Sequence, residues 1–464
     1  MKSRLILFLL AAAYTCSAQL PKEGQLSPEQ LTQIRASVKA EKNLTPVVNA
    51  ATENELKKLA QNRSNAGKTD HFFSNEVKTS GITDQKSSGR CWLFTGLNTI
   101  KPKVLEKYNL ADFEFSMNYN FFYDQFEKAN LFLEAIIYTA SKSMDDRYVD
   151  WLFKNPIGDG GQWANFADVV SKYGVVPKNA MPESFQSEST GSLNKMLSAK
   201  LREDGLQLRD LFTKKEKPEA LRAKKLDMLK DIYKMLVVML GEPPTEFEWR
   251  YKDKSGKITE PMKYTPQQFY AEACGVNFTD YVMLMNDPTR EYYKLYEIEW
   301  DRNTVEGTNW LYVNLPIEDV REFAKQSILG NEALYFSCDV GKQLDIEEGT
   351  LDVNNYDYGS LFGVTFGMDK KQRIMTYESG SSHGMALVGV DLAPDKSIRK
   401  WKLENSWGAT KGNKGYLTMT DAWFAEYMFR LVINKKYLNA KVLDVLKQKP
   451  TLLPPWDPMY KMDE

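Results

Sequence analysis

The feature that most constrains this chain is a short stretch that ends in a cysteine, residues 85–94. It reads Gln-Lys-Ser-Ser-Gly-Arg-Cys-Trp-Leu-Phe, so turn-forming residues run directly into an apolar segment. Apolar residues at Leu93 and Leu97 recur at helical spacing, which predicts a buried helix with Cys91 in its first turn. Unpaired N–H groups and the helix dipole lower the pKa of a thiol there. Gln85 lies upstream, where its side-chain amide is placed to donate to an oxyanion.

A lone cysteine on an apolar helix is more often a buried structural residue, because free cysteine is among the most buried residue types. The far end of the chain changes this interpretation. One of only two histidines, His383, precedes an apolar run that predicts a buried strand. Asn405 follows in an Asn-Ser-Trp-Gly turn whose Trp407 is placed to shield a His–Asn hydrogen bond from water. Cysteine, histidine and asparagine in this order predict a nucleophile, a base and an orienting amide.

With these motifs the chain resembles the bleomycin hydrolase and aminopeptidase C branch of the papain-like cysteine peptidases, nearly end to end. Besides residues 85–94, the similarity includes the motifs at 155–163, 172–177, 338–342 and 453–459. They read Asn-Pro-Ile-Gly-Asp-Gly-Gly-Gln-Trp, Lys-Tyr-Gly-Val-Val-Pro, Cys-Asp-Val-Gly-Lys and Leu-Pro-Pro-Trp-Asp-Pro-Met. Papain-like enzymes usually place the histidine roughly 130–150 residues after the cysteine. The longer interval here implies a large insertion.

The resemblance implies an α+β, two-domain papain-like fold with a helical insertion and two terminal arms. It implies that Cys91 attacks the peptide carbonyl as a thiolate beside a His383 imidazolium. Gln85 and the Cys91 N–H would hold the oxyanion, and Asn405 would orient the imidazole. The glycine loop would line the substrate cleft, although a tight turn is its simpler explanation. The C-terminal arm would end near the nucleophile, although chain ends are commonly disordered. The substrate-binding residues predicted in this way are Gly160, Gly161, Gln162, Trp163 and Glu464.

The predicted organisation has six parts. They are a signal peptide (1–18), an N-terminal arm (19–75), a helical domain with the cysteine (76–185), a helical insertion that serves oligomerisation (186–325), a β-sheet domain with the histidine and asparagine (326–435), and a C-terminal helix with an active-site arm (436–464). In the first arm, a capping box at Ser27 and a second start near Thr52 predict two short helices. In the insertion we expect helix over 201–240 and a β-hairpin over 246–256.

Residues 1–18 carry two basic residues, then an apolar run and small residues before a cut after Ala18, which is typical of a secretory signal. We therefore expect export to the periplasm or the medium, although relatives in this branch are typically cytoplasmic. A lipoprotein anchor at Cys16 is the alternative, which the bulky Tyr14 disfavours. The run is shorter than the ~20 residues of a membrane-spanning helix, so no membrane association is expected after cleavage.

Charge and cysteine usage exclude several classes of function. The chain has 61 basic and 62 acidic residues, so no general attraction to nucleic acid is expected. Basic residues in the insertion are interleaved with acidic ones, which favours a solvated helix face over nucleic-acid binding. Cys91, Cys274 and Cys338 do not have the number or spacing of a disulfide framework. We expect no metal site and no cofactor, because histidine clusters and CxxC motifs are missing. The other histidine, His71, lies in a polar stretch and is expected at the surface, outside the catalytic site.

These observations predict an exported thiol aminopeptidase that removes N-terminal residues from peptides through a thioester. The resemblance also implies a homohexamer. Two other functions stay open: an endopeptidase of the same fold, and a ring-shaped peptide-binding or chaperone-like assembly with incidental peptidase activity. The stiff proline-containing tail argues against the first, and the complete catalytic set argues against the second.

Overall fold

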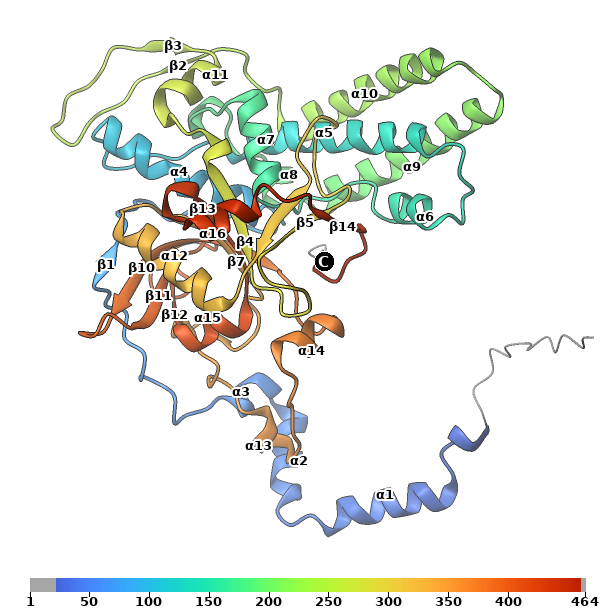
Figure 1. Ribbon diagram of the computed structural model, residues 1–464, viewed down its shortest axis with the longest axis vertical. Coiled ribbons are helices and arrows are strands. Elements are labelled where there is room, and N and C mark those ends of the chain that lie inside the picture. The colour runs from blue at the N-terminus through green and yellow to red at the C-terminus, as the bar shows by residue number, and fades with distance from the viewer. Residues whose placement is uncertain (1–21, 460–464) are drawn as a thin grey trace, which may run out of the picture.

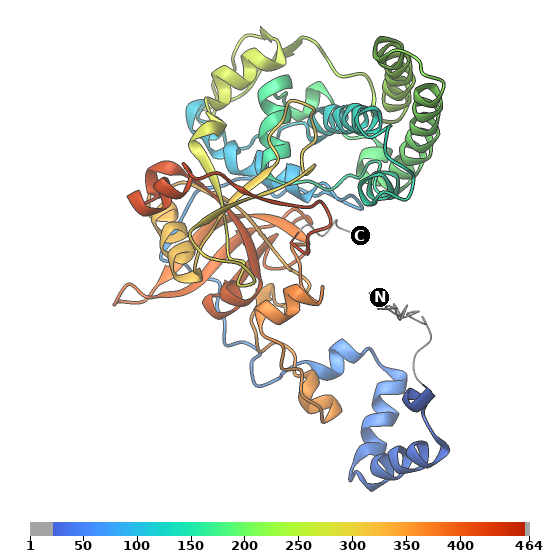
Figure 2. The same cartoon turned by 45° about the vertical axis from the view of Figure 1, so that its right-hand side comes forward.

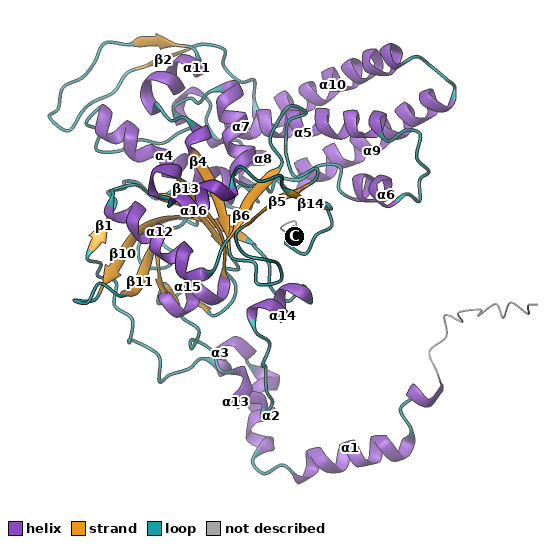
Figure 3. Ribbon diagram, in the orientation of Figure 1, coloured by secondary structure: helices purple, strands orange, loops and turns teal. Residues whose placement is uncertain are grey.

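The structure, a computed structural model, describes residues 22–459 of the chain. Figure 1 shows a helical half above a half built around one large sheet, with an N-terminal arm that projects away from the sheet. Most helices and most strands thus occupy separate halves (Figure 3), which confirms the predicted α+β class. In the part that the structure describes, no helix is long and apolar enough to cross a membrane.

The helical half is organised around a few long helices. They are α4 (Cys91–Lys107), α5 (Met117–Tyr138), α7 (Trp163–Tyr173), α9 (Gly191–Thr213) and α10 (Pro218–Leu240). Helices α4, α5 and α7 pack on one another, and α9 and α10 form a pair against α5 (Figure 2). Shorter helices complete this half: α6 (Arg147–Lys154), α8 (Phe185–Glu188) and α11 (Pro266–Phe269). The pair α9 and α10 confirms the predicted helical segment over residues 201–240.

The other half contains a 12-stranded, mainly antiparallel sheet in the order β14-β5-β6-β4-β13-β7-β10-β11-β12-β9-β8, with β1 beside β10. The strands are β1 (Asn75–Glu76), β4 (Tyr281–Met285), β5 (Lys294–Ile298), β6 (Trp310–Asn314), β7 (Leu334–Cys338), β8 (Leu344–Asp345), β9 (Thr350–Leu351), β10 (His383–Leu392), β11 (Ile398–Glu404), β12 (Tyr416–Thr420), β13 (Met428–Asn434) and β14 (Thr451–Leu453). The strand predicted at His383 is confirmed as β10, and residues 326–435 contribute β7 to β13 to this sheet.

The central strands are buried on both faces. Successive side chains of a strand point to opposite faces, so Val282 and Leu284 of β4 join one core while Met283 and Met285 join the other. The first core includes α12 (Ile317–Leu329) and α15 (Asp421–Tyr427), and the second includes the long helices of the upper half. This double burial explains the continuous apolar runs in the sequence.

The predicted insertion is helical only as far as Leu240. Strands β2 (Phe247–Trp249) and β3 (Met262–Tyr264) follow as an antiparallel hairpin, which confirms the hairpin prediction. The later strands β4, β5 and β6 then enter the large sheet, where β4 pairs with β13. The prediction of a helical insertion up to residue 325 is therefore wrong in its last part. The apolar strand β4 finds its pairing partner far along the chain, which local periodicity does not reveal.

The N-terminal arm contains α1 (Pro28–Ala40), α2 (Leu44–Glu53) and α3 (Leu56–Ala60). The capping box at Ser27 is confirmed, since its Oγ accepts from the Gln30 N–H at 3.2 Å. The second predicted start is wrong: Thr52 lies in the last turn of α2, which begins after Asn43. Asn43 is a common N-cap residue type, but here it has a φ of 66° and makes no side-chain cap hydrogen bond. Helices α1 and α2 bury none of their residues.

Three short helices lie around the sheet half: α13 (Tyr358–Phe362), α14 (Lys370–Met375) and α16 (Ala440–Val445). The last of these confirms the helix predicted at the start of residues 436–464. The tail then continues as β14, which pairs in parallel with β5. The C-terminal segment therefore reaches the helical half along the edge of the sheet (Figure 1).

Candidate active site

Cys91 is the first residue of α4, as predicted, and only 5% of it is exposed. The preceding carbonyl, of Arg90, accepts hydrogen bonds from the N–H groups of Leu93 at 2.9 Å and Phe94 at 3.1 Å. The Arg90 side chain is buried and ion-paired with Glu183 at 2.8 Å. The first turn of α4 is thus held by backbone hydrogen bonds to the Arg90 carbonyl and by the Arg90–Glu183 ion pair. The positive end of the helix dipole lies at the Cys91 thiol.

His383 begins β10, and this strand lies against the first turn of α4. The position next to the histidine, Gly384, shows how close the approach is. A Cβ atom built there would lie 3.1 Å from Thr95 Oγ1 and 3.6 Å from the Cys91 carbonyl oxygen. On its other side, His383 pairs with Cys338 of β7. The fold therefore brings the predicted base to the predicted nucleophile.

Asn405 and Trp407 complete this group. His383 Nε2 lies 2.8 Å from Asn405 Oδ1, and Asn405 is 2% exposed. The Asn405 oxygen can only accept, so Nε2 carries the proton and Nδ1 is left for a partner. The Trp407 indole stacks on the imidazole with ring centroids 4.7 Å apart. The predicted shielding of this hydrogen bond matches the geometry.

Burial lowers the pKa of His383 to about 4, and the hydrogen bond to Asn405 offsets only part of this effect. The neutral imidazole is therefore favoured at neutral pH. An imidazolium would need a negative partner close by, and the Cys91 thiolate is the one that the mechanism supplies. The predicted ion pair would thus form jointly on both residues, because burial works against a charge on the histidine alone.

Gln85 is buried and held on three sides. Its Nε2 donates to the Ser88 carbonyl at 2.7 Å, and its Oε1 accepts from Ser406 Oγ at 2.7 Å. Its backbone N–H also donates to the Ser406 carbonyl at 2.8 Å. A primary amide has two N–H donors, so one can still serve an oxyanion. Ser406 was not predicted as a site residue, and its place beside Asn405 in the turn was the only signal in the sequence.

A buried ion pair joins the two halves behind the site. Lys101 of α4 lies 3.4 Å from Glu404 of β11, with side-chain exposures of 2% and 0%. The lysine also donates to the Gly81 carbonyl at 2.9 Å. Glu404 precedes Asn405, so this pair connects the helix of the nucleophile to the turn that orients the base. Sequence reasoning missed Lys101, whose spacing places it on the apolar face of the helix.

The predicted glycine loop packs against the cysteine segment. The Asp159 carbonyl accepts from Trp92 Nε1 at 2.8 Å, and its carboxylate accepts from the Gly89 N–H at 2.7 Å. A Cβ atom at Gly161 would lie 2.8 Å from the Trp92 ring, so only glycine fits. Lys128 donates to the carbonyl of Gly160 at 2.6 Å. The loop therefore lies next to Cys91, where a cleft wall is expected.

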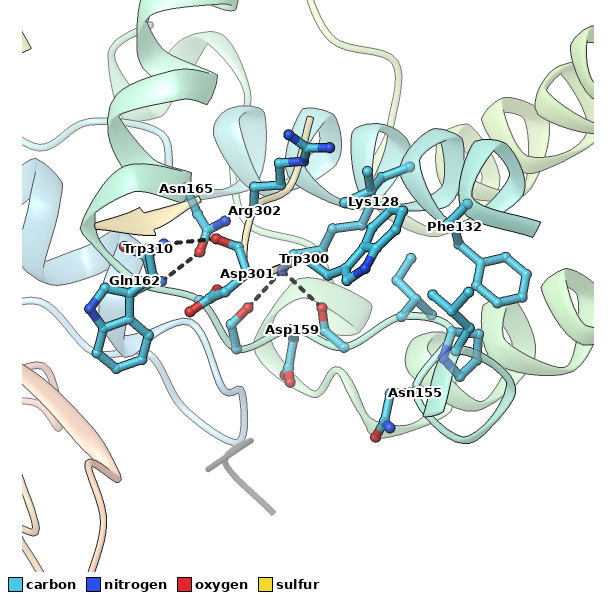
Figure 4. Close-up of a pocket in the computed structure, with 18 of the residues that line it drawn as sticks. Lys128, Phe132, Asn155, Asp159, Gln162, Asn165, Trp300, Asp301, Arg302 and Trp310 are labelled. Carbon is cyan, nitrogen blue, oxygen red and sulfur yellow. Dashed lines mark hydrogen bonds between the residues drawn. The ribbon is translucent and has the colours of Figure 1, made fainter. Parts of the chain in front are cut away.

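The other two residues predicted from this loop differ in position. Gln162 caps α7, since its Oε1 accepts from the Ala164 N–H at 2.6 Å. It also lines a cavity beside the loop (Figure 4). Trp163 is 7% exposed and packs on core rings such as Phe166 and Phe278. The substrate-binding prediction for Trp163 is therefore wrong, because the start of α7 turns its indole into the core.

The C-terminal tail is anchored as far as it is described. Trp456 stacks edge-on against Tyr148, with centroids 4.9 Å apart, and under the Arg147 guanidinium at 4.0 Å. Asp457 is ion-paired with Arg290, and Met459 is 1% exposed. Trp456 thus anchors the tail to the helical half. The predicted substrate contact at Glu464 lies outside the described residues, as do residues 1–18 with Cys16.

The remaining cysteines and the second histidine lie elsewhere. Cys274 and Cys338 are free thiols, and burial raises the pKa of Cys274 to about 12 and that of Cys338 well above its ordinary value. His71 Nδ1 lies 2.7 Å from Thr418 Oγ1, and the residue is half-buried against β12. His71 therefore lies partly exposed beside β12 and away from the catalytic residues, as predicted.

Comparisons with known proteins agree with this geometry. Residues 25–460 match the Peptidase C1-like family. The chain is 39% identical to aminopeptidase C of Listeria monocytogenes, over 89% of this chain and 91% of the relative. It is 37% identical to human bleomycin hydrolase, over 95% of this chain and 99% of the relative. The crystal structure of PepW from Lactobacillus rhamnosis HN001 superposes with a TM-score of 0.92 at 38% identity and covers 94% of this chain and 99% of that one.

Proposed function

The chain belongs to the Peptidase C1-like family, in its aminopeptidase C and bleomycin hydrolase branch, and from this premise we propose that it is a cysteine aminopeptidase. One observation carries the proposal. A strand that begins with His383, hydrogen-bonded to Asn405 at 2.8 Å, lies against the first turn of a helix that begins with Cys91. A peptide-binding assembly without catalysis has no need for this set.

In the proposed mechanism, the proton of Cys91 passes to His383 Nδ1, and the resulting thiolate attacks the peptide carbonyl. The tetrahedral oxyanion receives hydrogen bonds from the Cys91 N–H and from the second Nε2 hydrogen of Gln85. His383 then gives its proton to the leaving amine, and the C–N bond breaks to leave a thioester. Water attacks the thioester with His383 as base, which releases the acid and restores the thiol.

Asn405 and Trp407 act through the histidine. The Asn405 oxygen fixes the tautomer, so the acceptor nitrogen of the imidazole faces the nucleophile. The stacked indole keeps water from competing for that hydrogen bond. Burial of the imidazole lowers its pKa, so it releases the proton readily to the leaving group.

We further propose that the tail makes the enzyme an exopeptidase. The segment with Trp456 and Asp457 is fixed against the helical half, and in this proposal residues 460–464 continue from it into the cleft. There they would occupy the space of a longer substrate, and the terminal carboxylate of Glu464 would pair with the substrate α-amino group. This tail also favours the proposal over an endopeptidase of the same fold.

The experiment compares single-residue aminoacyl arylamides with their N-acetylated counterparts. We expect hydrolysis of the free-amine substrates only, and loss of that activity in Cys91→Ser with an unchanged circular dichroism spectrum. Equal hydrolysis of blocked and free substrates would support the endopeptidase, and retained activity in Cys91→Ser would overturn the assignment of the nucleophile.

We also propose a homohexamer and export. The exposed apolar residues Ile34 and Val38 on α1, an arm helix that buries no residue, suit contacts between subunits. Light scattering of the purified protein tests the hexamer, and a stable monomer at micromolar concentration would refute it. Export rests on the composition of residues 1–18, and fractionation of cells that make the protein with and without these residues tests it.

A further inference from the structure

A cavity of about 140 Å³ lies beside the glycine loop, between α5, α6, β6 and β13. Figure 4 shows its two ends, with Gln162, Asp301 and Trp310 at one and Phe132 and Asn155 at the other. None of its polar residues has a role in the mechanism above. Its wall at Gly161 packs on Trp92, which follows Cys91 in α4, so the cavity lies on the glycine loop that borders the cysteine segment.

Four residues that line this cavity carry a buried polar atom without a hydrogen-bond partner: Asp301 Oδ2, Trp310 Nε1, Arg430 Nε and Arg302 Nε. Asp301, Trp310 and Arg430 are 5%, 0% and 6% exposed. The Arg430 guanidinium lies 3.8 Å from the centroid of the Trp310 ring, so the two donors are neighbours. Native proteins pair nearly all buried polar groups. One acceptor and three donors left open along a single cavity indicate that a ligand group completes some of them.

The rest of the lining is mainly apolar and aromatic. It includes Leu131, Phe132, Trp151, Ile157 and Trp300. Trp300 adopts a φ of 66°, a left-handed conformation that is rare for a bulky residue and clusters at ligand-binding sites. An apolar wall with a polar end suits a side chain that is apolar along its length and polar at its tip.

The charges around the polar end favour an uncharged tip. Asp301, Arg302 and Arg430 all line the cavity, so a carboxylate would meet Asp301 and an ammonium would meet the two arginines. Lys128 is already engaged, by Asp124 at 2.7 Å and by carbonyls of the glycine loop. A hydroxyl or carboxamide, in contrast, can donate to Asp301 and accept from Trp310 or Arg430 without burying a new charge.

We propose that this cavity binds the side chain of the substrate's N-terminal residue and prefers one that ends in a hydroxyl or a carboxamide, such as tyrosine or glutamine. The proposal rests on the proposed aminopeptidase function and names its substrate class. Asp301 accepts the hydrogen of the side-chain tip, and Trp310 and Arg430 donate to its oxygen. A side chain without these groups leaves all three unpaired, which sites built to bind a polar tip discriminate against strongly.

Matched aminoacyl arylamides test the preference: tyrosine against phenylalanine, and glutamine against leucine. At pH 8, above the pKa of about 7 that burial gives Asp301, we expect kcat/KM to favour the polar member of each pair by ~10-fold or more. Removal of both charges in Asp301→Leu/Arg430→Leu should abolish or invert each ratio. The ratio within a pair cancels any change in overall activity.

A matched control removes an exposed charge pair, Asp210→Leu/Lys214→Leu on α9, and should leave both ratios unchanged. If the cavity double variant does not fold, Trp310→Phe removes one donor while keeping the ring, and should lower both ratios on its own. Ratios near one in the wild type, or ratios that survive these cavity variants, would overturn the proposal and leave the cavity as a water site. A wild type that cleaves no aminoacyl substrate would instead refute the proposed function.

Discussion

His383 Nε2 lies 2.8 Å from Asn405 Oδ1, and the Trp407 indole is stacked on the same imidazole. The amide oxygen also accepts from the Ser406 N–H at 2.8 Å, so it cannot turn away from the histidine without losing that bond as well. The turn therefore fixes the imidazole from its edge and from its face. The turn with Asn405 and Trp407 therefore sets the position of the His383 imidazole.

This arrangement predicts unequal effects of two substitutions. His383→Ala should reduce kcat/KM by roughly 10²–10⁴-fold, the range of a general acid–base group. Asn405→Ala should reduce it less, because the imidazole remains and loses only its orientation. Steady-state kinetics on an alanyl arylamide measure both. A larger loss in Asn405→Ala than in His383→Ala would contradict the assigned roles.

Burial of His383 also predicts a pH-dependent stability. Its pKa falls from 6.5 to about 4 on folding, so the unfolded state binds the proton more readily. The stabilisation is complete above pH 6.5 and is lost as the pH falls toward 4. Its size is about 3 kcal/mol, from ~1.4 kcal/mol per pKa unit.

Urea unfolding at pH 7.5 and pH 4.5 measures this contribution. The comparison is best made between Cys91→Ala and Cys91→Ala/His383→Gln, because loss of the thiol removes its coupling to the imidazole. The variant that keeps His383 should lose about 2–3 kcal/mol more on acidification. Asp301, whose pKa burial raises to about 7, is present in both proteins and cancels. Equal losses in the two proteins would contradict the buried neutral imidazole.

The three thiols should differ in reactivity. Burial raises the pKa of Cys274 to about 12 and that of Cys338 well above its ordinary value, so neither forms thiolate near neutral pH. Cys91 has the helix terminus and His383 beside it. One equivalent of iodoacetamide at pH 7 should label Cys91 first, as peptide mass spectrometry would show, and His383→Ala should slow that labelling. Faster labelling of Cys274 with activity retained would contradict the choice of nucleophile.

The sequence predicted the elements that carry the catalytic residues because their signals are local. The apolar spacing after Cys91 and the apolar run after His383 each fix one element. Membership of the large sheet is not local: Val282 pairs with Ile433, so β4 could not be assigned to the sheet from its own residues.

The polar end of the cavity could not be predicted from the sequence either. Asp301 and Arg430 lie far apart along the chain and line one cavity only in the folded protein. Arg430 is the single charged residue of β13, whose other residues are apolar except for Asn434. Arginine is rarely buried unless it is paired, so an arginine in a buried strand indicates a partner or a ligand. Trp163 gave the opposite error: the family motif placed it at the cleft, but the start of α7 decides where its indole points.

The anchoring of the tail yields the last prediction. Asp457 is ion-paired with Arg290, which also binds the Asp287 carboxylate, and Trp456 is held by Tyr148 and Arg147. Removal of Arg290 would leave two buried carboxylates unpaired and would destabilise the fold. The tail itself is therefore the better target, and Trp456→Ala/Asp457→Asn removes its ring and its charge while Arg290 keeps Asp287.

If the tail limits the cleft, this variant should cleave N-acetylated peptides internally, as should a chain ending at Met459, while the wild type does not. Mass spectrometry of the products from an N-acetylated decapeptide would measure it, and labelling of Cys91 by iodoacetamide should remain fast in all three proteins. Leu452→Ala provides the control, because that residue lies in the same tail but is 56% exposed. A variant that stays a strict aminopeptidase would show that the tail does not set specificity, and the glycine loop would then be the element to test.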